Sequence, residues 1–256
     1  MTVLPKRAMV LAAGLGTRMR PITDHTPKPL ISVGGKTMLD RVLDHLLAAG
    51  VKDVVVNVHH HPGKIRSHLA QRRGGPSTTI SDETERLLET GGGVRNALPL
   101  LGPNPFFVAN ADIIWLEAAR PALERLGRHW RPDRMDALLL VKRTADAWGY
   151  DGLGDFFMDG TGVLRRRGEG EVAPYIYAGV MILKPDAMIG TPDGPFSLNV
   201  VFDRLLAGNR LYGVAHDGPW FHVGTPDSIV PTERRIKALL SGVDDPLADL
   251  SGPGLP

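Results

Sequence analysis

Cysteine is absent from this chain of 256 residues, which excludes disulfides, thiolate metal ligands and cysteine nucleophiles. A large excess of one charge is also missing, because 30 Lys and Arg residues against 28 Asp and Glu residues leave a formal net charge of +2. So small an excess does not indicate a nucleic-acid-binding protein. No apolar run approaches the length of a membrane span, and no apolar signal segment stands at the N-terminus. We therefore expect a cytoplasmic protein that binds neither nucleic acid nor membrane.

The segment 11–30, LAAGLGTRMRPITDHTPKPL, carries the strongest functional signal in the chain. The apolar run of residues 8–13 is suited to a buried first strand. Gly14 and Gly16 then allow a sharp turn that brings backbone N–H groups close to a bound anion. Three cations follow on a stretch whose prolines exclude a regular helix: Arg18, Arg20 and Lys28. A strand leading into a glycine turn and fixed cations predicts a polyphosphate site that works by charge stabilisation.

Two common nucleotide-binding loops are excluded by what this segment lacks. The dinucleotide-binding fingerprint needs a third glycine where Met19 stands, and the Gly-Lys-Ser/Thr ending of the P-loop is missing. No Gly-x-Ser-x-Gly nucleophile elbow occurs either. The consecutive residues His59, His60 and His61 match no zinc-ligand spacing and are interpreted as loop residues. An unrelated dehydrogenase is therefore disfavoured.

Short apolar segments alternate with helical patterns through the first half of the chain. The predicted strands are residues 8–13, 54–58, 106–110 and 137–141, and the predicted helices are 38–49, 62–72 and 118–126. Strand–helix–strand repetition implies crossover connections and a parallel sheet covered by helices on both faces. The predicted fold is α/β, with a Rossmann-like, mixed and mostly parallel sheet. Ligands in such sheets lie at the carboxyl ends of strands, where the glycine turn falls.

The pattern changes to glycine-rich short strands between residues 148 and 171, which is more typical of hairpins than of crossovers. A strand at Tyr175–Leu183 and helices near 197–207 and 226–240 are predicted to follow. We expect one domain over residues 1–240, with a larger half at about 6–145 and a smaller, β-rich half at about 146–240. Residues 241–256 have little to bury and are expected to form a loose tail.

Two further segments are candidates for the same site. Residues 89–93, ETGGG, form either a flexible loop before a helix that begins near Val94 or a glycine surface on which a nucleobase or sugar lies flat. We favour the second interpretation. Asp112 follows the apolar strand at 106–110, and its carboxylate could cap a helix or bind Mg²⁺ together with phosphate oxygens. Residues 89–93 are therefore a candidate surface for a nucleobase or sugar, and Asp112 is a candidate metal ligand.

The pattern G-x-G-T-R-x-x-P followed by T-P-K-P-L resembles the signature of the sugar-1-phosphate nucleotidyltransferases, from about Lys6 to about Leu240. The resemblance implies a GT-A-like fold whose larger half binds the nucleotide and whose smaller half binds the sugar. It also implies condensation of a nucleoside triphosphate with a sugar-1-phosphate, releasing pyrophosphate. ETGGG matches the segment that contacts the base and ribose in this family. Asp112 matches the aspartate that binds the metal between the two phosphates.

Carried onto this chain, the resemblance assigns three catalytic residues, Arg18, Lys28 and Asp112. Arg18 and the loop N–H groups would hold the β- and γ-phosphates, and Lys28 would bridge the α-phosphate and the sugar phosphate. The nucleotide-binding residues that it implies besides Arg18 are Leu11, Ala12, Ala13, Gly14, Gly16, Thr17, Glu83, Thr90, Gly91 and Gly92. The sugar-binding residues that it implies are Asn110, Asp155, Tyr177, Gly179 and Asn199. Core packing is an equally good interpretation of Tyr177 and Gly179.

One position departs from the family pattern. The family supplies a second metal carboxylate in a late W-x-D-V-G-T motif, whereas this chain reads WFHVGT, with His222 at the aspartate position. Imidazole suits Mg²⁺ poorly, because Mg²⁺ favours hard oxygen donors. His222 could bind Mn²⁺ or Co²⁺, hydrogen-bond a phosphate or water, or mark weakened catalysis. We favour a functional His222, with Mg²⁺ held mostly by Asp112, phosphates and water.

Within the family, the short chain, the ETGGG segment and the lack of a C-terminal β-helix resemble the N-acetylmuramate-1-phosphate uridylyltransferases of peptidoglycan recycling. The expected substrates are UTP and N-acetylmuramate 1-phosphate, and the expected product is the nucleotide sugar UDP-MurNAc. Mannose-1-phosphate guanylyltransferases and glucose-1-phosphate thymidylyltransferases share the first motif and stay open as alternatives. So does a nucleotide-sugar sensor that binds without turnover. Both a monomer and a homodimer are compatible with the sequence.

Overall fold

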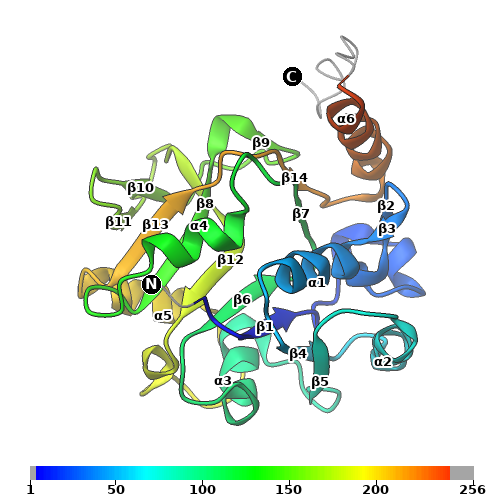
Figure 1. Ribbon diagram of the computed structural model, residues 1–256, viewed down its shortest axis with the longest axis horizontal. Coiled ribbons are helices and arrows are strands. Elements are labelled where there is room, and N and C mark those ends of the chain that lie inside the picture. Colours follow the sequence, from blue (N-terminus) through cyan, green and yellow to red (C-terminus); the bar gives the residue numbers. More distant parts are fainter. Residues whose placement is uncertain (1–3, 243–256) are drawn as a thin grey trace.

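The computed structural model describes residues 4–242 and shows strands alternating with helices through the first half of the chain (Figure 1). The strands are β1 (Arg7–Leu11), β2 (Ser32–Val33), β3 (Lys36–Thr37), β4 (Asp53–Val58), β5 (Ser77–Asp82), β6 (Phe106–Asn110), β7 (Ile113–Trp115), β8 (Ala137–Arg143), β9 (Ala147–Trp148), β10 (Phe156–Met158), β11 (Leu164–Arg166), β12 (Tyr175–Leu183), β13 (Leu211–Ala215) and β14 (Trp220–His222). The helices are α1 (Met38–Ala48), α2 (Pro62–Gln71), α3 (Glu89–Leu101), α4 (Ala122–His129), α5 (Asn199–Ala207) and α6 (Ile229–Ser241).

The central sheet is mixed and mostly parallel, as predicted. β1 lies between β4 and β6 and is parallel to both, and β5 continues the parallel order beyond β4. β12 runs antiparallel to β6 and to β8, and β13 is parallel to β8. Since β1 and β6 point the same way, the segments that follow Leu11 and Asn110 leave the sheet at one edge.

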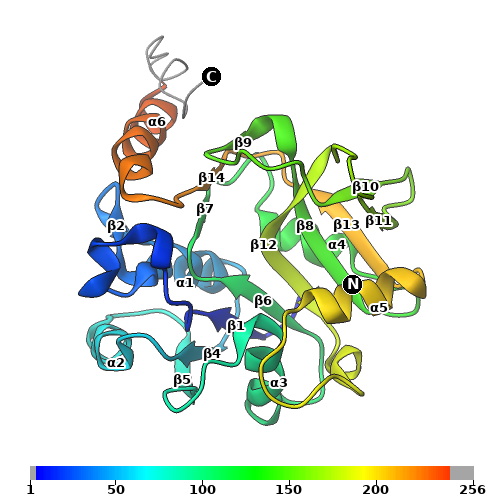
Figure 2. The same cartoon turned by 180° about the vertical axis from the view of Figure 1, so that it is seen from behind.

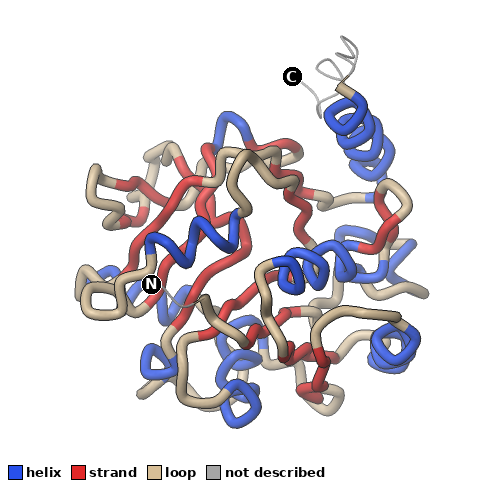
Figure 3. Tube along the Cα trace, viewed as in Figure 1, coloured by secondary structure: helices blue, strands red, loops and turns tan. Residues whose placement is uncertain are grey.

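Alternate residues of the strands face two different cores. Ala8 and Val10 of β1 pack with apolar residues of α1, α2 and α4, whereas Met9 between them packs with residues of α3 and α5. This division follows from the period of two in a strand that is buried on both faces. Figure 3 shows the helices distributed on both sides of the strands. The expected α/β fold with two covered faces is confirmed.

A third, smaller core holds the segment after β1 in place. Met19 and Ile31 pack there with apolar residues of β7, β14 and α6, among them Ile114, Phe221 and Ile236. Figure 1 shows α6 standing beside β2 at one end of the molecule. The irregular loop that carries the cations is therefore anchored on an apolar base.

Short strands lie around β12 (Figure 2). β10 and β11 form an antiparallel hairpin that joins the start of β12, in line with the predicted hairpins, and β7, β14 and β9 form a separate small sheet. β12 shifts register against β8 between Tyr177 and Met181. Gly179 lies in this bulge with φ +82°, and a Cβ there would stand 2.8 Å from Ile113 Cδ1. Glycine is thus required for β12 to approach the end of β6.

Two predicted helix starts are wrong. α3 begins at Glu89 and not near Val94, so the glycines of ETGGG lie in its first turns and not in a loop. α4 spans Ala122–His129 and not residues 118–126, because Pro121, which is poorly tolerated inside a helix, stands directly before its first residue. The expected tail at 241–256 lies outside the described residues except for Ser241 and Gly242, and Ser241 is the last residue of α6.

Asp136 ties together the ends of three neighbouring strands, β8, β12 and β13. Its carboxylate accepts hydrogen bonds from Arg210 Nε at 3.0 Å, from Arg210 Nη2 at 2.9 Å and from Lys184 Nζ at 2.8 Å. Mainly because of the hydrogen bonds from Arg210, with Lys184 adding to them, the pKa of Asp136 falls from 3.8 to about 2. The ionised carboxylate therefore stabilises the folded state above the unfolded-state pKa, and this stabilisation is lost as the pH falls towards 2.

We expect Asp136→Asn to lower the free energy of unfolding by about 1–2 kcal/mol at pH 7, since the substitution removes a partly screened pair of charged hydrogen bonds. Urea denaturation of both proteins between pH 7 and pH 2 should show the difference shrinking below about pH 4. Asp133→Asn is the matched control, because Asp133 is exposed, accepts the Arg210 hydrogen bond through its backbone carbonyl, and acts on Arg210 by charge without a side-chain hydrogen bond. A difference that stays constant down to pH 2 would contradict this role for Asp136.

Candidate active site

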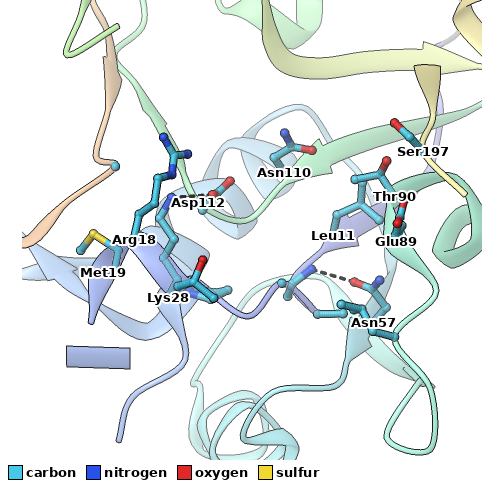
Figure 4. A pocket seen from close by; sticks show the side chains of 18 residues that line it. Leu11, Arg18, Met19, Lys28, Asn57, Glu89, Thr90, Asn110, Asp112 and Ser197 are labelled. Carbon is cyan, nitrogen blue, oxygen red and sulfur yellow. Dashed lines mark hydrogen bonds and ion pairs between the residues drawn. The ribbon is translucent and has the colours of Figure 1, made fainter. Parts of the chain in front are cut away.

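A pocket of about 510 Å³ opens where the chain leaves β1 and β6 (Figure 4). The residues that line it are Leu11, Ala12, Ala13, Gly14, Gly16, Thr17, Arg18, Met19, Lys28, Pro29, Asn57, Leu87, Glu89, Thr90, Asn110, Asp112, Ser197 and Gly224. Figure 4 shows Arg18, Lys28 and Asp112 at one end and Leu11, Glu89 and Thr90 at the other. The pocket is thus polarised, with its cations at one end.

Three short 3₁₀ turns shape the cationic end: Thr17–Met19, Ile22–Asp24 and Lys28–Leu30. This is the irregular loop that the prolines predict. Gly16 precedes the first turn with φ +61°, and a Cβ at this position would stand 2.9 Å from Thr23 Cγ2 and 3.1 Å from Lys28 Cβ. Glycine at position 16 therefore permits both the left-handed backbone and the close packing of the loop on itself.

Lys28 is the buried cation of the site. Its residue surface is only 7% exposed, and Lys28 Nζ donates to Asp112 Oδ2 at 2.7 Å. Burial by itself would raise the pKa of Asp112, but the Lys28 ammonium and the nearby His222 outweigh burial and hold that pKa below its usual range. Arg18 is exposed and makes no hydrogen bond or ion pair within residues 4–242. Of the two cations, Lys28 is thus fixed and Arg18 is available to a ligand.

His222 ends β14 close to these three charged residues. Burial lowers the pKa of the His222 imidazole, and the charges of Lys28 and Arg18 lower it further against the opposing effect of Asp112. The ring lies nearly parallel to that of Trp220, with centroids 6.3 Å apart. His222 is therefore a half-buried, neutral imidazole near pH 7. Within residues 4–242, no group of three or more His, Cys, Asp or Glu side chains could hold a metal ion by itself.

Thr23 holds the cationic loop to the start of α2. The Thr23 hydroxyl donates to the carbonyl of Gly16 at 2.9 Å, while the Thr23 carbonyl lies 2.8 Å from Nε2 of His60 and 3.3 Å from Nε2 of His61. The consecutive histidines are thus loop residues, and two of them contact the backbone of the cationic loop. Thr23 itself is 1% exposed, so these contacts are shielded from water.

A buried polar link joins the two sides of the pocket from behind. Asn57 Oδ1 accepts from Ala12 N at 2.7 Å, and Asn57 Nδ2 donates to Glu83 Oε1 at 2.8 Å. Glu83 Oε2 in turn accepts from Leu88 N at 3.1 Å. Burial raises the pKa of Glu83, and these donors offset only part of that rise. Glu83 thus lies behind the pocket, with both carboxylate oxygens engaged.

The glycines of ETGGG pack against the segment before α5. Gly91 N and Gly92 N donate to the carbonyl of Phe196 at 2.8 and 3.1 Å. A Cβ on Gly91 would stand 2.4 Å from the Phe196 ring, and one on Gly92 would stand 2.5 Å from the carbonyl oxygen of Gly194. Thr90 lines the pocket, but its hydroxyl accepts from Leu198 N at 2.9 Å. The absence of side chains at 91 and 92 therefore serves helix packing, and these two glycines do not line the pocket.

The predicted sugar-side residues are only partly brought together. Asn110 lines the pocket, and Gly179 packs against it. Tyr177 packs edge-on against Phe202 with its hydroxyl buried and without a partner in residues 4–242, and burial strongly raises its pKa. Asp155 Oδ2 accepts from Tyr177 N at 2.8 Å. The fifth residue, Asn199, accepts from Arg166 at 3.2 Å, on the exposed face of α5.

Several pocket residues were missed by the sequence analysis. They are Met19, Pro29, Asn57, Leu87, Ser197 and Gly224. Only Asn57 had a usable signal, since a single amide inside the apolar run VVVNV must find buried hydrogen-bond partners. The others enter the pocket through the packing of distant segments. A mixed, mostly parallel sheet carries a glycine turn, two cations and a carboxylate at one edge, which is typical of α/β proteins that bind phosphorylated ligands.

Comparison with known proteins identifies the family. A model described as the MobA-like NTP transferase domain matches residues 8–173. A protein of Caulobacter vibrioides named N-acetylmuramate alpha-1-phosphate uridylyltransferase is 46% identical over 92% of this chain and 99% of its own length. A protein of the same name from Neisseria meningitidis serogroup B is 34% identical over 86% of this chain and 93% of its own. The chain therefore belongs to the MobA-like NTP transferase family and is a sugar-1-phosphate nucleotidyltransferase, an enzyme, as the motifs predicted.

Solved structures show the same fold at low sequence identity. The inositol-1-phosphate CTP transferase from T. maritima superimposes with a TM-score of 0.75 at 15% identity, over 96% of this chain and 98% of that one. A UDP-glucose pyrophosphorylase complexed with UDP-glucose also gives 0.75, at 14% identity, over 91% of this chain and 99% of that one. The predicted nucleotidyltransferase fold is thus confirmed.

The packing of Gly91 leads to a test of what the glycines do. We expect Gly91→Ala to lower the free energy of unfolding by about 1–3 kcal/mol, because the new methyl group must displace the Phe196 ring and lies 2.8 Å from its backbone oxygen. Thermal or urea denaturation measures the loss. Gly63→Ala in α2 is the control, because nothing lies within 4 Å of its Cβ and alanine favours a helix. Unchanged stability with weakened nucleotide binding would instead place Gly91 against the nucleotide.

Proposed function

We propose that this chain condenses UTP with N-acetylmuramate 1-phosphate to give UDP-N-acetylmuramate and pyrophosphate. The observation that carries the proposal is the 46% identity to the Caulobacter vibrioides uridylyltransferase, which extends over 99% of that protein. The mannose-1-phosphate guanyltransferase of Yarrowia lipolytica is 32% identical, and this chain spans 61% of its length. The polarised pocket, with cations at one end only, supports the binding of a nucleoside triphosphate.

In the proposed reaction, an oxygen of the sugar phosphate attacks the α-phosphorus in line. A bond forms between that oxygen and the α-phosphorus, the bond from the α-phosphorus to the bridging oxygen breaks, and pyrophosphate leaves with the electron pair. No general base is needed, since the attacking phosphate is already ionised near neutral pH. Catalysis then consists of positioning and charge stabilisation.

The places of the residues in the pocket support the roles that we propose for them. Lys28 is held at its position by burial and by Asp112, which suits a cation that must meet the α-phosphate and the sugar phosphate together. Arg18 and the N–H groups of residues 11–17 would hold the β- and γ-phosphates, because Arg18 is exposed at the same end. We further propose that residues 6–145 bind the nucleotide and residues 146–240 the sugar, with Asn110 at their junction.

The side chains at this end of the pocket fit a divalent cation whose coordination is completed by phosphate oxygens of the substrates. Mg²⁺ takes one or two carboxylates together with phosphate oxygens and water, and Asp112 presents one carboxylate of lowered pKa to the pocket. When bound there, the cation supplies charge that aligns and neutralises the phosphate oxygens. Neutral His222 would hydrogen-bond a phosphate or water beside it. A second carboxylate is missing from position 222, so Mn²⁺ and Co²⁺ are included as candidates.

The cellular setting is proposed from the similarity to the two N-acetylmuramate alpha-1-phosphate uridylyltransferases. Within residues 4–242, no helix is long and apolar enough to cross a membrane. We propose a cytoplasmic enzyme acting on two small phosphorylated molecules, in the recycling of peptidoglycan sugars, as a monomer or homodimer. No contact with nucleic acid is needed for the proposed reaction.

Lys28→Ala should lower kcat by at least about 100-fold, the usual loss when one preorganised electrostatic contact to a transition state is removed. The assay is pyrophosphate release under saturating substrates, with the circular dichroism spectrum as a check on folding. Lys52→Ala is the control, because Lys52 is exposed and remote from the pocket. Turnover close to that of the wild type would remove Lys28 from the catalytic residues.

The substrates are tested by measuring pyrophosphate release from UTP, dTTP, GTP, CTP and ATP, each with several sugar-1-phosphates. We expect release from UTP with N-acetylmuramate 1-phosphate in the presence of Mg²⁺, and its loss when EDTA removes the metal. Higher rates with Mn²⁺ or Co²⁺ than with Mg²⁺ would indicate that His222 is a ligand. Release only from GTP with mannose 1-phosphate, or only from dTTP with glucose 1-phosphate, would show that the proposed substrates are wrong.

A further inference from the structure

His45 is a polar residue on the otherwise apolar inner face of α1. The buried residues of this helix are all apolar: Met38, Leu39, Val42, Leu43 and Leu46. The side chain of His45 is 20% exposed, and its ring is stacked on that of Trp115, with centroids 4.2 Å apart and an interplanar angle of 19°. A leucine at position 45 would continue the apolar face and could pack on the same ring. Packing alone therefore does not account for a histidine here.

Both ring nitrogens of His45 lie within hydrogen-bond distance of an oxygen. Nδ1 is 2.8 Å from Glu117 Oε1, and Nε2 is 3.2 Å from the carbonyl oxygen of Trp115. Burial by itself would raise the pKa of Glu117, but the hydrogen bonds from His45 and from Ala122 N hold that pKa below its usual range. A carbonyl and an ionised carboxylate have no proton to give, so the ring satisfies both oxygens only by donating from each nitrogen. His45 and Glu117 therefore form an ion pair.

The Glu117 carboxylate joins three elements at one point. Its Oε1 also accepts from Trp115 Nε1 at 3.1 Å, and its Oε2 accepts from Ala122 N at 2.7 Å. Trp115 is the last residue of β7, and Ala122 is the first residue of α4. The ion pair with His45 thus fixes the end of β7 and the start of α4 to α1.

α1 is also attached to the cationic loop. Met38 N, at the start of α1, donates to the carbonyl of Ile31 at 3.2 Å, directly after the turn at Lys28–Leu30. β7 begins at the residue after Asp112, and Figure 1 shows α1 beside β7. His45 follows Met38 by two helical turns. One end of α1 therefore holds the loop that carries the ammonium, and His45 holds the strand that follows the carboxylate.

We propose that His45 is a positioning residue, which fixes β7 on α1 and so holds Asp112 in the place opposite Lys28 that the reaction requires. The inference rests on the proposed function for the role of these two residues. Apolar contacts are non-directional, whereas an ion pair with a hydrogen bond at each ring nitrogen has one geometry. Replacing a buried ion pair by apolar residues often leaves stability unchanged, so stability alone does not explain this one. A displacement of about 1 Å in a catalytic group can cost about 100-fold in rate.

The first test measures kcat and KM for UTP by pyrophosphate release in the wild type, His45→Gln, Glu117→Gln and the double variant. Each single substitution should lower kcat about tenfold and leave KM for UTP within about twofold, because the alignment of Asp112 changes while the nucleotide site is intact. The double variant should be no slower than the slower single variant, since both substitutions break the same contact. Glu117→Gln keeps an acceptor for Ala122 N.

Asp136→Asn is the matched control for a loss of stability. It removes ion pairs with Lys184 and Arg210, and Asp136 does not line the pocket. This variant should lower Tm as His45→Gln does while its kcat stays within about twofold of the wild type. The proposal would be overturned if His45→Gln kept wild-type kcat, or if Asp136→Asn lost as much kcat. Losses that multiply in the double variant would overturn it as well.

The second test is hydrogen exchange, which reports on β7 without turnover. The backbone amides of residues 113–117 should exchange about tenfold faster in His45→Gln than in the wild type, and at the wild-type rate in Asp136→Asn. Unchanged exchange in His45→Gln would contradict the proposal whatever the activity. If the wild type turns over no sugar phosphate, the proposed function is refuted, and exchange alone decides whether His45 holds β7.

Discussion

The ion pair between Lys28 and Asp112 is the interaction on which the rest of the site depends. Its partners are 84 residues apart in the chain and 2.7 Å apart in space. They meet because β1 and β6 pair in parallel, so the segments after both strands leave the sheet at the same edge. A buried ammonium without a partner is strongly destabilising. The cationic loop can therefore keep Lys28 in place only while Asp112 faces it, and the cation and carboxylate that the proposed reaction needs are side by side before substrate binds.

Buried polar contacts hold both sides of this pocket in one arrangement. Asn57 and Glu83 join the backbone of Ala12 to that of Leu88, and Thr23 joins Gly16 to the histidines before α2. The side chains of Asn57, Glu83 and Thr23 are buried, so leaving one of their polar atoms without a partner would cost the penalty of its desolvation. The loops are thus preorganised around the position of the phosphates. Preorganised charge is the main source of rate enhancement expected when no proton has to be moved.

Most of the fold could be predicted because the local signals agree with the tertiary structure. β6 and β12 have the predicted bounds, since apolar runs with polar or proline residues at both ends leave little choice. The prediction of a loop at residues 89–93 was wrong, because α3 begins at Glu89. Three glycines disfavour a helix on intrinsic propensity, but the carbonyl of Phe196, a residue over 100 positions away, accepts from Gly91 N and Gly92 N and stabilises the first turn of α3. No local pattern contains that contact.

By itself, the sequence determined the class of protein, the position of the cationic loop and the irregular backbone of that loop. These features could be predicted because glycine, proline and charged residues act on the chain close to their own positions. Only the tertiary structure decided which polar residues face the pocket. Glu83 is turned inward to Asn57, Tyr177 packs onto Phe202, and Glu89 lines the pocket. The direction of a side chain depends on what packs behind it, and here those partners come from segments far apart in the chain.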